Sequence, residues 1–122
     1  LDFFPANERE QIRRQLAQCL KAIIGQRLFP AKHGGVVPAI EIMVNTPIVR
    51  KLLEDDRLEQ LPIAIQSGGE DGMQSFNQSI YHLIKNDVIT KEEGLAKATN
   101  PEQLKMNLEG IFLDEGRRII GN

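Results

Sequence analysis

Hydrophobic residues near the start of the chain recur with the spacing of one helix face. Their intervals of three or four positions are typical of an amphipathic α-helix. Pro5 and Asn7 lie at the start of this pattern and Gly25 follows it, so we predict a helix over residues 7–24. The face that we expect this helix to bury consists of Ile12, Leu16, Cys19, Leu20 and Ile23.

The next hydrophobic runs have the character of strands. Residues 26–31 and 36–44 flank Lys32, His33, Gly34 and Gly35, and the second run is rich in β-branched side chains. Two glycines readily adopt the positive φ angles that a tight turn requires, so we predict a β-hairpin. Since proline has no N–H to donate to a ladder, we expect Pro30 and Pro38 to lie at an edge or a bulge.

The remainder of the chain is predicted to form a series of short helices. Each expected start carries a capping residue, a proline in the first turn, or both. The start signals are Thr46-Pro47, Leu61-Pro62, Ser75 with Gln78, Thr90 with Glu93, and Asn100-Pro101. The apolar positions expected to face inward are Phe76, Ile80, Leu83, Ile84, Leu95, Ala98, Leu104, Leu108, Ile111, Phe112 and Ile119. The fold class is therefore α+β, predominantly α, with a β-hairpin followed by a C-terminal bundle of short helices.

Composition limits the classes of function. The 122 residues are 41% hydrophobic and carry a formal charge of −2, which is typical of a soluble domain or of one piece of a larger protein. No apolar run is long enough to cross a membrane and no signal peptide is visible, so membrane insertion is not expected. The balanced charge argues against a nucleic-acid partner. Because the chain begins with Leu1 rather than Met, we expect a fragment.

The sequence offers no catalytic, cofactor-binding or metal-binding residue. It lacks G-x-x-x-x-G-K-[ST], G-x-S-x-G and H-E-x-x-H, the patterns of phosphate cradles, nucleophile elbows and zinc proteases. A single cysteine, Cys19, with His33 and His82 is too few for a four-ligand zinc site, and it fits a reducing compartment. We interpret Cys19 as a core residue, the two histidines as surface residues, and the acidic pairs at 55–56 and 70–71 as solvated helix ends.

One segment has a more informative pattern. Residues 46–55 place apolar side chains on one face of a short helix and charged side chains on the other. Arg50 and Glu54 are four positions apart and are expected to form a weak ion pair. A plain amphipathic surface helix would have the same pattern.

Several stretches, taken in order, resemble PilT-like type IV pilus retraction ATPases of the secretion-ATPase superfamily, over their C-terminal part. The resemblance covers nearly the whole chain. The stretches are Phe4-Pro5-Ala6 with Gln11, Arg13, Gln15, Leu16 and Leu20; residues 24–28; residues 39–44 with Thr46-Pro47; residues 72–78; residues 88–93; and residues 100–102.

The retraction motif of this family, A-I-R-N-L-I-R-E, aligns with residues 48–55. Most positions keep the chemical character of the motif, but Ile48 replaces a small residue, Lys51 replaces Asn, and Glu54 reverses the charge of Arg. Pilus-extension and type II secretion ATPases typically carry a four-cysteine zinc module, so the single Cys19 favours the retraction branch. The candidate site is the motif-like helix Ile48, Val49, Arg50, Lys51, Leu52, Leu53, Glu54 and Asp55.

The resemblance implies a cytoplasmic homohexameric ring, working at the inner face of the bacterial membrane, in which ATP turnover drives pilus retraction and twitching motility. Residues 1–45 would complete a RecA-like ATPase core, and residues 46–122 would form a C-terminal helical subdomain. The P-loop, and with it ATP and Mg²⁺, would belong to the chain before Leu1, so the parent would be the enzyme and this fragment alone would not. Its partners would be the other subunits and proteins of the pilus machinery.

Two other interpretations remain open at this point. The chain could be a free-standing helical module for protein interaction, or a fragment of a related pilus or secretion ring ATPase. The hairpin favours a fragment of a larger fold, because a two-stranded sheet alone is marginally stable.

Overall fold

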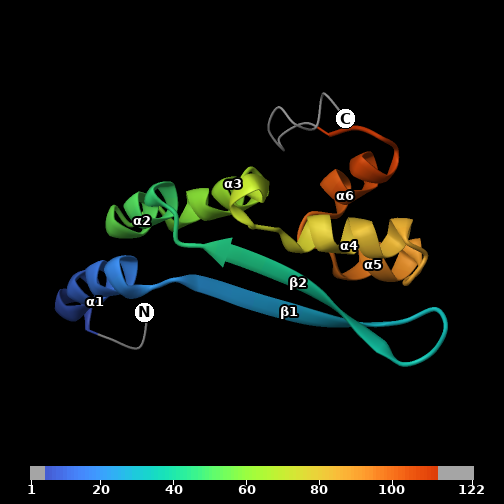
Figure 1. The fold of residues 1–122 in the computed structure, drawn as a ribbon, viewed down its shortest axis with the longest axis horizontal. Helices are drawn as coiled ribbons and strands as arrows, with labels where there is room; N and C mark the ends of the chain where they lie inside the picture. Colours follow the sequence, from blue (N-terminus) through green and yellow to red (C-terminus); the bar gives the residue numbers. More distant parts are fainter. Residues whose placement is uncertain (1–4, 113–122) are drawn as a thin grey trace.

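A long β-hairpin carries helices along its length (Figure 1). The computed structural model describes residues 5–112. The first helix, α1, spans Ala6–Cys19, and the strands β1 and β2 span Ala22–Pro30 and Val36–Val44. The later helices are α2 Pro47–Glu54, η1 Leu58–Gln60, α3 Leu61–Gln66, η2 Gly69–Asp71, α4 Phe76–Lys85, α5 Lys91–Lys97 and α6 Pro101–Leu108. The expected fold class, a hairpin followed by short helices, is confirmed.

The hairpin is antiparallel, with Ala22 opposite Val44 and Pro30 opposite Val36. Gly34 and Gly35 form the turn with φ angles of 106° and 73°, which glycine adopts without a steric penalty.

Both prolines occupy positions where no ladder hydrogen bond is lost. Ile40 and Ile42 donate their N–H groups away from β1, to Ser79 Oγ and Gln74 O. Pro38 is two residues before Ile40, and alternate residues of a strand direct their backbone nitrogens to the same side. The nitrogen of Pro38 therefore also faces away from β1, where no ladder hydrogen bond would form. Pro30 lies at the end of β1. Both prolines thus lie at an edge of this two-stranded sheet, as predicted.

The predicted first helix was too long. It ends at Cys19, and β1 begins at Ala22, so Gly25 lies within a strand rather than after a helix. The physical reason is that Ile23 and Ile24 are β-branched and pair with Met43 and Ile42 of β2, and such side chains fit a pleated sheet better than a helix.

The apolar face expected on this helix is only partly correct, since Leu20 alone of its members packs on a hydrophobic cluster of the described residues. Ala17 is the buried residue of α1, whereas Leu16 is 40% exposed and Cys19 is exposed. Helical spacing identifies an apolar stripe but does not say whether a partner covers it. Cys19 is therefore not the core residue that we expected.

Two hydrophobic clusters form the interior, and the hairpin contributes to both. The first joins the turn half of the hairpin to α4, α5 and α6; its buried members are Phe29, Ala39, Ile80, Ile89 and Leu104. The second joins the other half to α2 and α3; its buried members are Met43, Val49, Ile65 and Met73. The expected inward residues of α4 and α5 all pack on the first cluster, whereas Ile111 is 44% exposed and Ile119 lies outside the described residues.

The opposite face of the hairpin is partly exposed within the described residues. The helices that follow β2 all lie on one side of it in Figure 1. On the other face, Ile24, Leu28 and Val36 are 69%, 53% and 65% exposed. Among residues 5–112, β1 has no strand neighbour except β2.

Capping residues begin the helices as the sequence predicts. The hydroxyls of Thr46, Ser75 and Thr90 accept hydrogen bonds from the backbone N–H three residues on. Asn100 does the same for Gln103. The α4 cap is a complete capping box, because Gln78 Oε1 also accepts from Ser75 N–H.

The hairpin turn is tied to the loop after α4, and this contact predicts an acid dependence. Lys32 donates to the Asp87 carboxylate and forms an ion pair with it. This hydrogen bond and the positive charge of Lys32 lower the pKa of Asp87 below its ordinary value. The stabilisation is therefore present above the unfolded-state pKa of about 3.9 and is lost as the pH falls through the lowered pKa of the folded state.

We expect Asp87→Asn to be less stable than the wild type at neutral pH, with the difference vanishing in acid. Asparagine suits the positive φ of 61° at this position, so the change removes mainly the charge. Urea unfolding at a series of pH values measures the difference. A gap that stays constant down to strong acid would contradict the assignment.

Candidate functional site

The motif-like segment forms helix α2, as predicted. Thr46 Oγ1 accepts a hydrogen bond from Val49 N–H at 3.3 Å, and Pro47 occupies the first turn. Asp55 is the C-cap residue.

The apolar side of α2 divides into a buried and an exposed part. Val49 is fully buried and Leu53 packs on the second cluster. Leu52 is only half-buried, and Ile48 is 68% exposed. The apolar face predicted for this segment is therefore only partly buried, because α2 packs through Val49 and Leu53 and turns Ile48 outward.

The polar side of α2 is accessible. Arg50 and Lys51 are both exposed. The ion pair on this helix joins Lys51 Nζ to Asp55 Oδ2 at 3.5 Å, instead of the expected pair of Arg50 with Glu54. Within residues 5–112, Arg50 makes no ion pair. Its guanidinium is thus available to a group outside the described residues.

An open groove lies between α2 and α3, beside the motif-like helix. Its volume is about 310 Å³. Exposed Ile48 and Ile63 stand on its two walls, Met73 is one of its lining residues, and Asp71 adds a carboxylate. The groove was not predictable from the sequence, since nothing in the local pattern of residues 58–71 relates them to residue 48.

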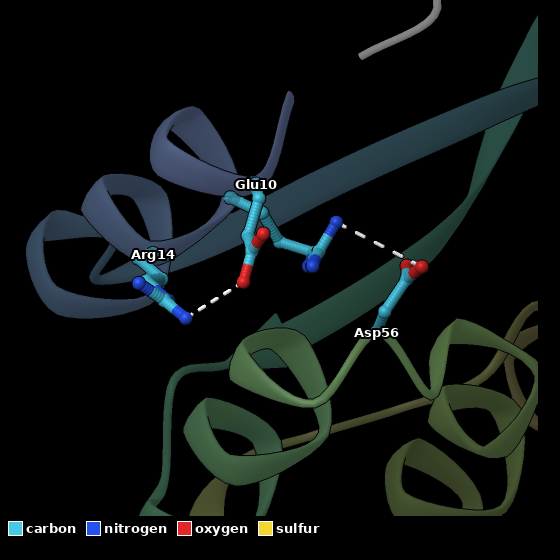
Figure 2. Close-up of polar contacts among 4 residues, drawn as sticks. Glu10, Arg14 and Asp56 are labelled. Carbon is cyan, nitrogen blue, oxygen red and sulfur yellow. Dashed lines mark hydrogen bonds and ion pairs between the residues drawn. The ribbon is translucent and has the colours of Figure 1, made fainter. Parts of the chain in front are cut away.

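Helix α1 lies beside α2 and is joined to it by charged side chains. Figure 2 shows Asp56, directly after α2, reached from α1, and the separate pair of Arg14 with Glu10 within α1. Arg13 Nη1 is 3.7 Å from Asp56 Oδ2, and the Arg13 side chain is only 15% exposed. Arg14 Nη2 is 2.7 Å from Glu10 Oε1, with both side chains largely exposed. Of these two ion pairs, only the one between Arg13 and Asp56 therefore joins α1 to the segment that follows α2.

The other candidate residues do not gather into a site. His33 and His82 are both exposed, as expected. Within residues 5–112, no three His, Cys, Asp or Glu side chains come close enough to hold a metal ion. None of the helices described there is long and apolar enough to span a bilayer.

The sequence and the fold of this chain were compared with those of known proteins. No protein-family model matches the sequence. The type IV pilus retraction ATPase PilT of Pseudomonas aeruginosa is 38% identical over 102 residues, which make up 84% of this chain and 30% of that protein. The solved structure of the pilus retraction motor PilT with bound ADP superposes with a TM-score of 0.72 and 35% identity, over 85% of this chain and 29% of that one. The chain matches the C-terminal part of PilT-like proteins.

A second relative belongs to the same group. The type IV pilus ATPase PilU of P. aeruginosa is 34% identical over 110 residues, covering 89% of this chain and 29% of PilU. The chain thus spans less than a third of the length of the PilT-like relatives it matches. The resemblance noted in the sequence, to the C-terminal part of the pilus retraction ATPases, is confirmed.

Proposed function

We propose that the chain is the C-terminal part of a hexameric ATPase motor that drives type IV pilus retraction, and that α2 couples ATP turnover to the pilus machinery. The observation that carries the proposal is α2 itself. Its sequence resembles the retraction motif of PilT-like proteins, and the helix is anchored through Val49 and Leu53 and presents Arg50 to the outside. An exposed cation contributes little to stability, since surface ion pairs contribute only about 0–1 kcal/mol. Arg50 therefore acts on a neighbour.

The exposed apolar side chains on the opposite face of the hairpin support the assignment of the two parts of this chain to different parts of the motor. An exposed apolar sheet face with an unpaired edge strand is a surface for further structure. Residues 1–45 would thus complete the RecA-like ATPase core, and residues 46–122 would form the helical subdomain. ATP and Mg²⁺ would bind the parent chain outside this fragment, which has no P-loop, and the motor would work in the cytoplasm at the inner face of the membrane.

Two alternatives are less well supported. A free-standing interaction module would leave the apolar hairpin face in water. A motor of a related secretion system would also have this fold, since the ATPase DotB of Legionella pneumophila superposes with a TM-score of 0.59, against 0.72 for PilT. Its identity of 17% speaks for the fold alone, whereas the PilT-like relatives exceed 30%.

The decisive experiment changes Arg50 in the full-length protein. We expect Arg50→Ala to leave ring assembly, melting temperature and ATPase rate near their normal values and to abolish twitching motility. The matched control is Lys105→Ala, which removes an exposed cation from α6 and should leave motility intact. Normal motility of Arg50→Ala would reject the proposal, and lost motility with a collapsed melting temperature would assign Arg50 a structural role instead.

A further inference from the structure

A single residue, Asn45, joins the end of α1 to the start of the motif-like helix. Its side-chain Nδ2 donates to the carbonyl oxygens of Ala17 at 2.8 Å and Leu20 at 2.7 Å. Its backbone N–H donates to Lys21 O at 2.9 Å. The last carbonyls of a helix lack partners within the helix, so Asn45 satisfies the C-terminal end of α1 from outside.

The residue after Asn45 begins α2. Thr46 caps that helix through its hydroxyl, and its carbonyl accepts from Arg50 N–H at 2.8 Å. Two consecutive residues thus hold the end of one helix and the beginning of the next. A shift of α1 along or across its axis would have to break the Asn45 hydrogen bonds or carry Thr46 with it.

A second attachment lies at the other end of α2. There Arg13 of α1 reaches Asp56, and Ala17, whose carbonyl accepts from Asn45, is completely buried. Most of the remaining surface of α1 is exposed, and α2 is the described element against which it mainly packs. Helix α1 is therefore tied both to the residue that precedes the α2 cap and to the residue that follows the α2 C-cap.

We propose that Asn45 is a positioning residue that locks α1 and α2 into one rigid unit, so that the motif-like helix follows any displacement of α1. In this proposal α1 and α2 move together within this chain, whatever the chain acts on. Its consequence for pilus retraction rests on the proposed function, in which α1 and the hairpin adjoin the ATPase core and would transmit its motion.

The chemistry of the amide makes this proposal testable. An amide NH₂ offers two donors, one for each carbonyl, whereas the carboxylate of aspartate has the same shape and no donor. Asn45→Asp would also place a negative charge against the negative end of the α1 dipole. The matched control is Asn86→Asp, which puts the same charge at the C-cap of α4.

Spin labels measure the distance between the two helices in the full-length protein. One label uses Cys19, exposed on α1, and the other Lys51→Cys, 71% exposed on α2; any other cysteine is replaced by serine. We expect one narrow distance distribution, unchanged when an ATP analogue is added. Asn45→Asp should broaden or shift it, and Asn86→Asp should not.

Each result of the distance measurement either supports or overturns the rigid unit of α1 and α2. A wild-type distance that changes with nucleotide, or an Asn45→Asp distribution identical to the wild type, would overturn the rigid unit. If Asn45→Asp fails to fold, the wild-type nucleotide comparison still decides. Expected distances combined with normal motility of Arg50→Ala would reject the proposed function and leave the rigid unit standing.

Discussion

Replacing Ile80 with alanine is expected to lower the free energy of unfolding by about 2–5 kcal/mol. Ile80 of α4 is completely buried in the first cluster, among Phe29, Ala39, Ile89 and Leu104. The substitution removes apolar contacts and leaves a cavity between the hairpin and the C-terminal helices, and both effects are unfavourable. Urea unfolding followed by circular dichroism measures the change.

The matched control is Ile63→Ala. Ile63 is 64% exposed, so the same chemical change should alter stability by no more than about 0.5 kcal/mol. Equal losses for the two variants would show that the first cluster is not the main core.

Gly68→Ala is expected to cost about 1–3 kcal/mol through overpacking. A Cβ at this position would lie 2.7 Å from Met73 Cε and 2.9 Å from the backbone oxygen of Ala64. The methionine end could move, but the carbonyl belongs to α3 and is fixed by the helix. Since Gly68 and Met73 both line the groove beside α2, the same variant should also disturb the groove. Thermal unfolding reports the loss of stability.

A second glycine provides the comparison for Gly68. At Gly25 of β1 an added Cβ would be 3.4 Å from Phe76 Cζ, which is ordinary contact, so Gly25→Ala should be tolerated. If Gly68→Ala melted at the wild-type temperature, the close packing of the loop between α3 and α4 would be refuted.

The parts of the fold that local chemistry determines were predictable from the sequence. The Thr46, Ser75 and Thr90 caps each depend on residues three positions apart, and the hairpin turn depends on two adjacent glycines. These signals act within a few residues, so no knowledge of the tertiary structure is needed to interpret them.

The wrong predictions concern segments whose conformation or burial depends on residues far away in the sequence. The stripe predicted for residues 7–24 has helical spacing, but among the described residues Leu20 packs on the second cluster while Leu16 and Cys19 stay exposed. The strand at residues 22–25 was missed because its conformation is set by pairing with β2, which lies later in the chain.

The candidate site shows the same limit. Its position came from the motif-like sequence, and the burial of Val49 agreed with the pattern of residues 48–55. The outward turn of Ile48, the groove and the role of Asn45 all depend on α3 or α1. No pattern within residues 45–55 contains that information.

The separation of the interior into two clusters has a consequence for the dynamics of the molecule. Cooperative opening proceeds by regions that share a core, and here the core around Ile80 and the core around Val49 are joined by the hairpin and by the hydrogen bond from Gln78 Nε2 of α4 to Gln66 O of α3. Transient release of α4, α5 and α6 would break that hydrogen bond and leave α2 seated on Met43 and Ile65.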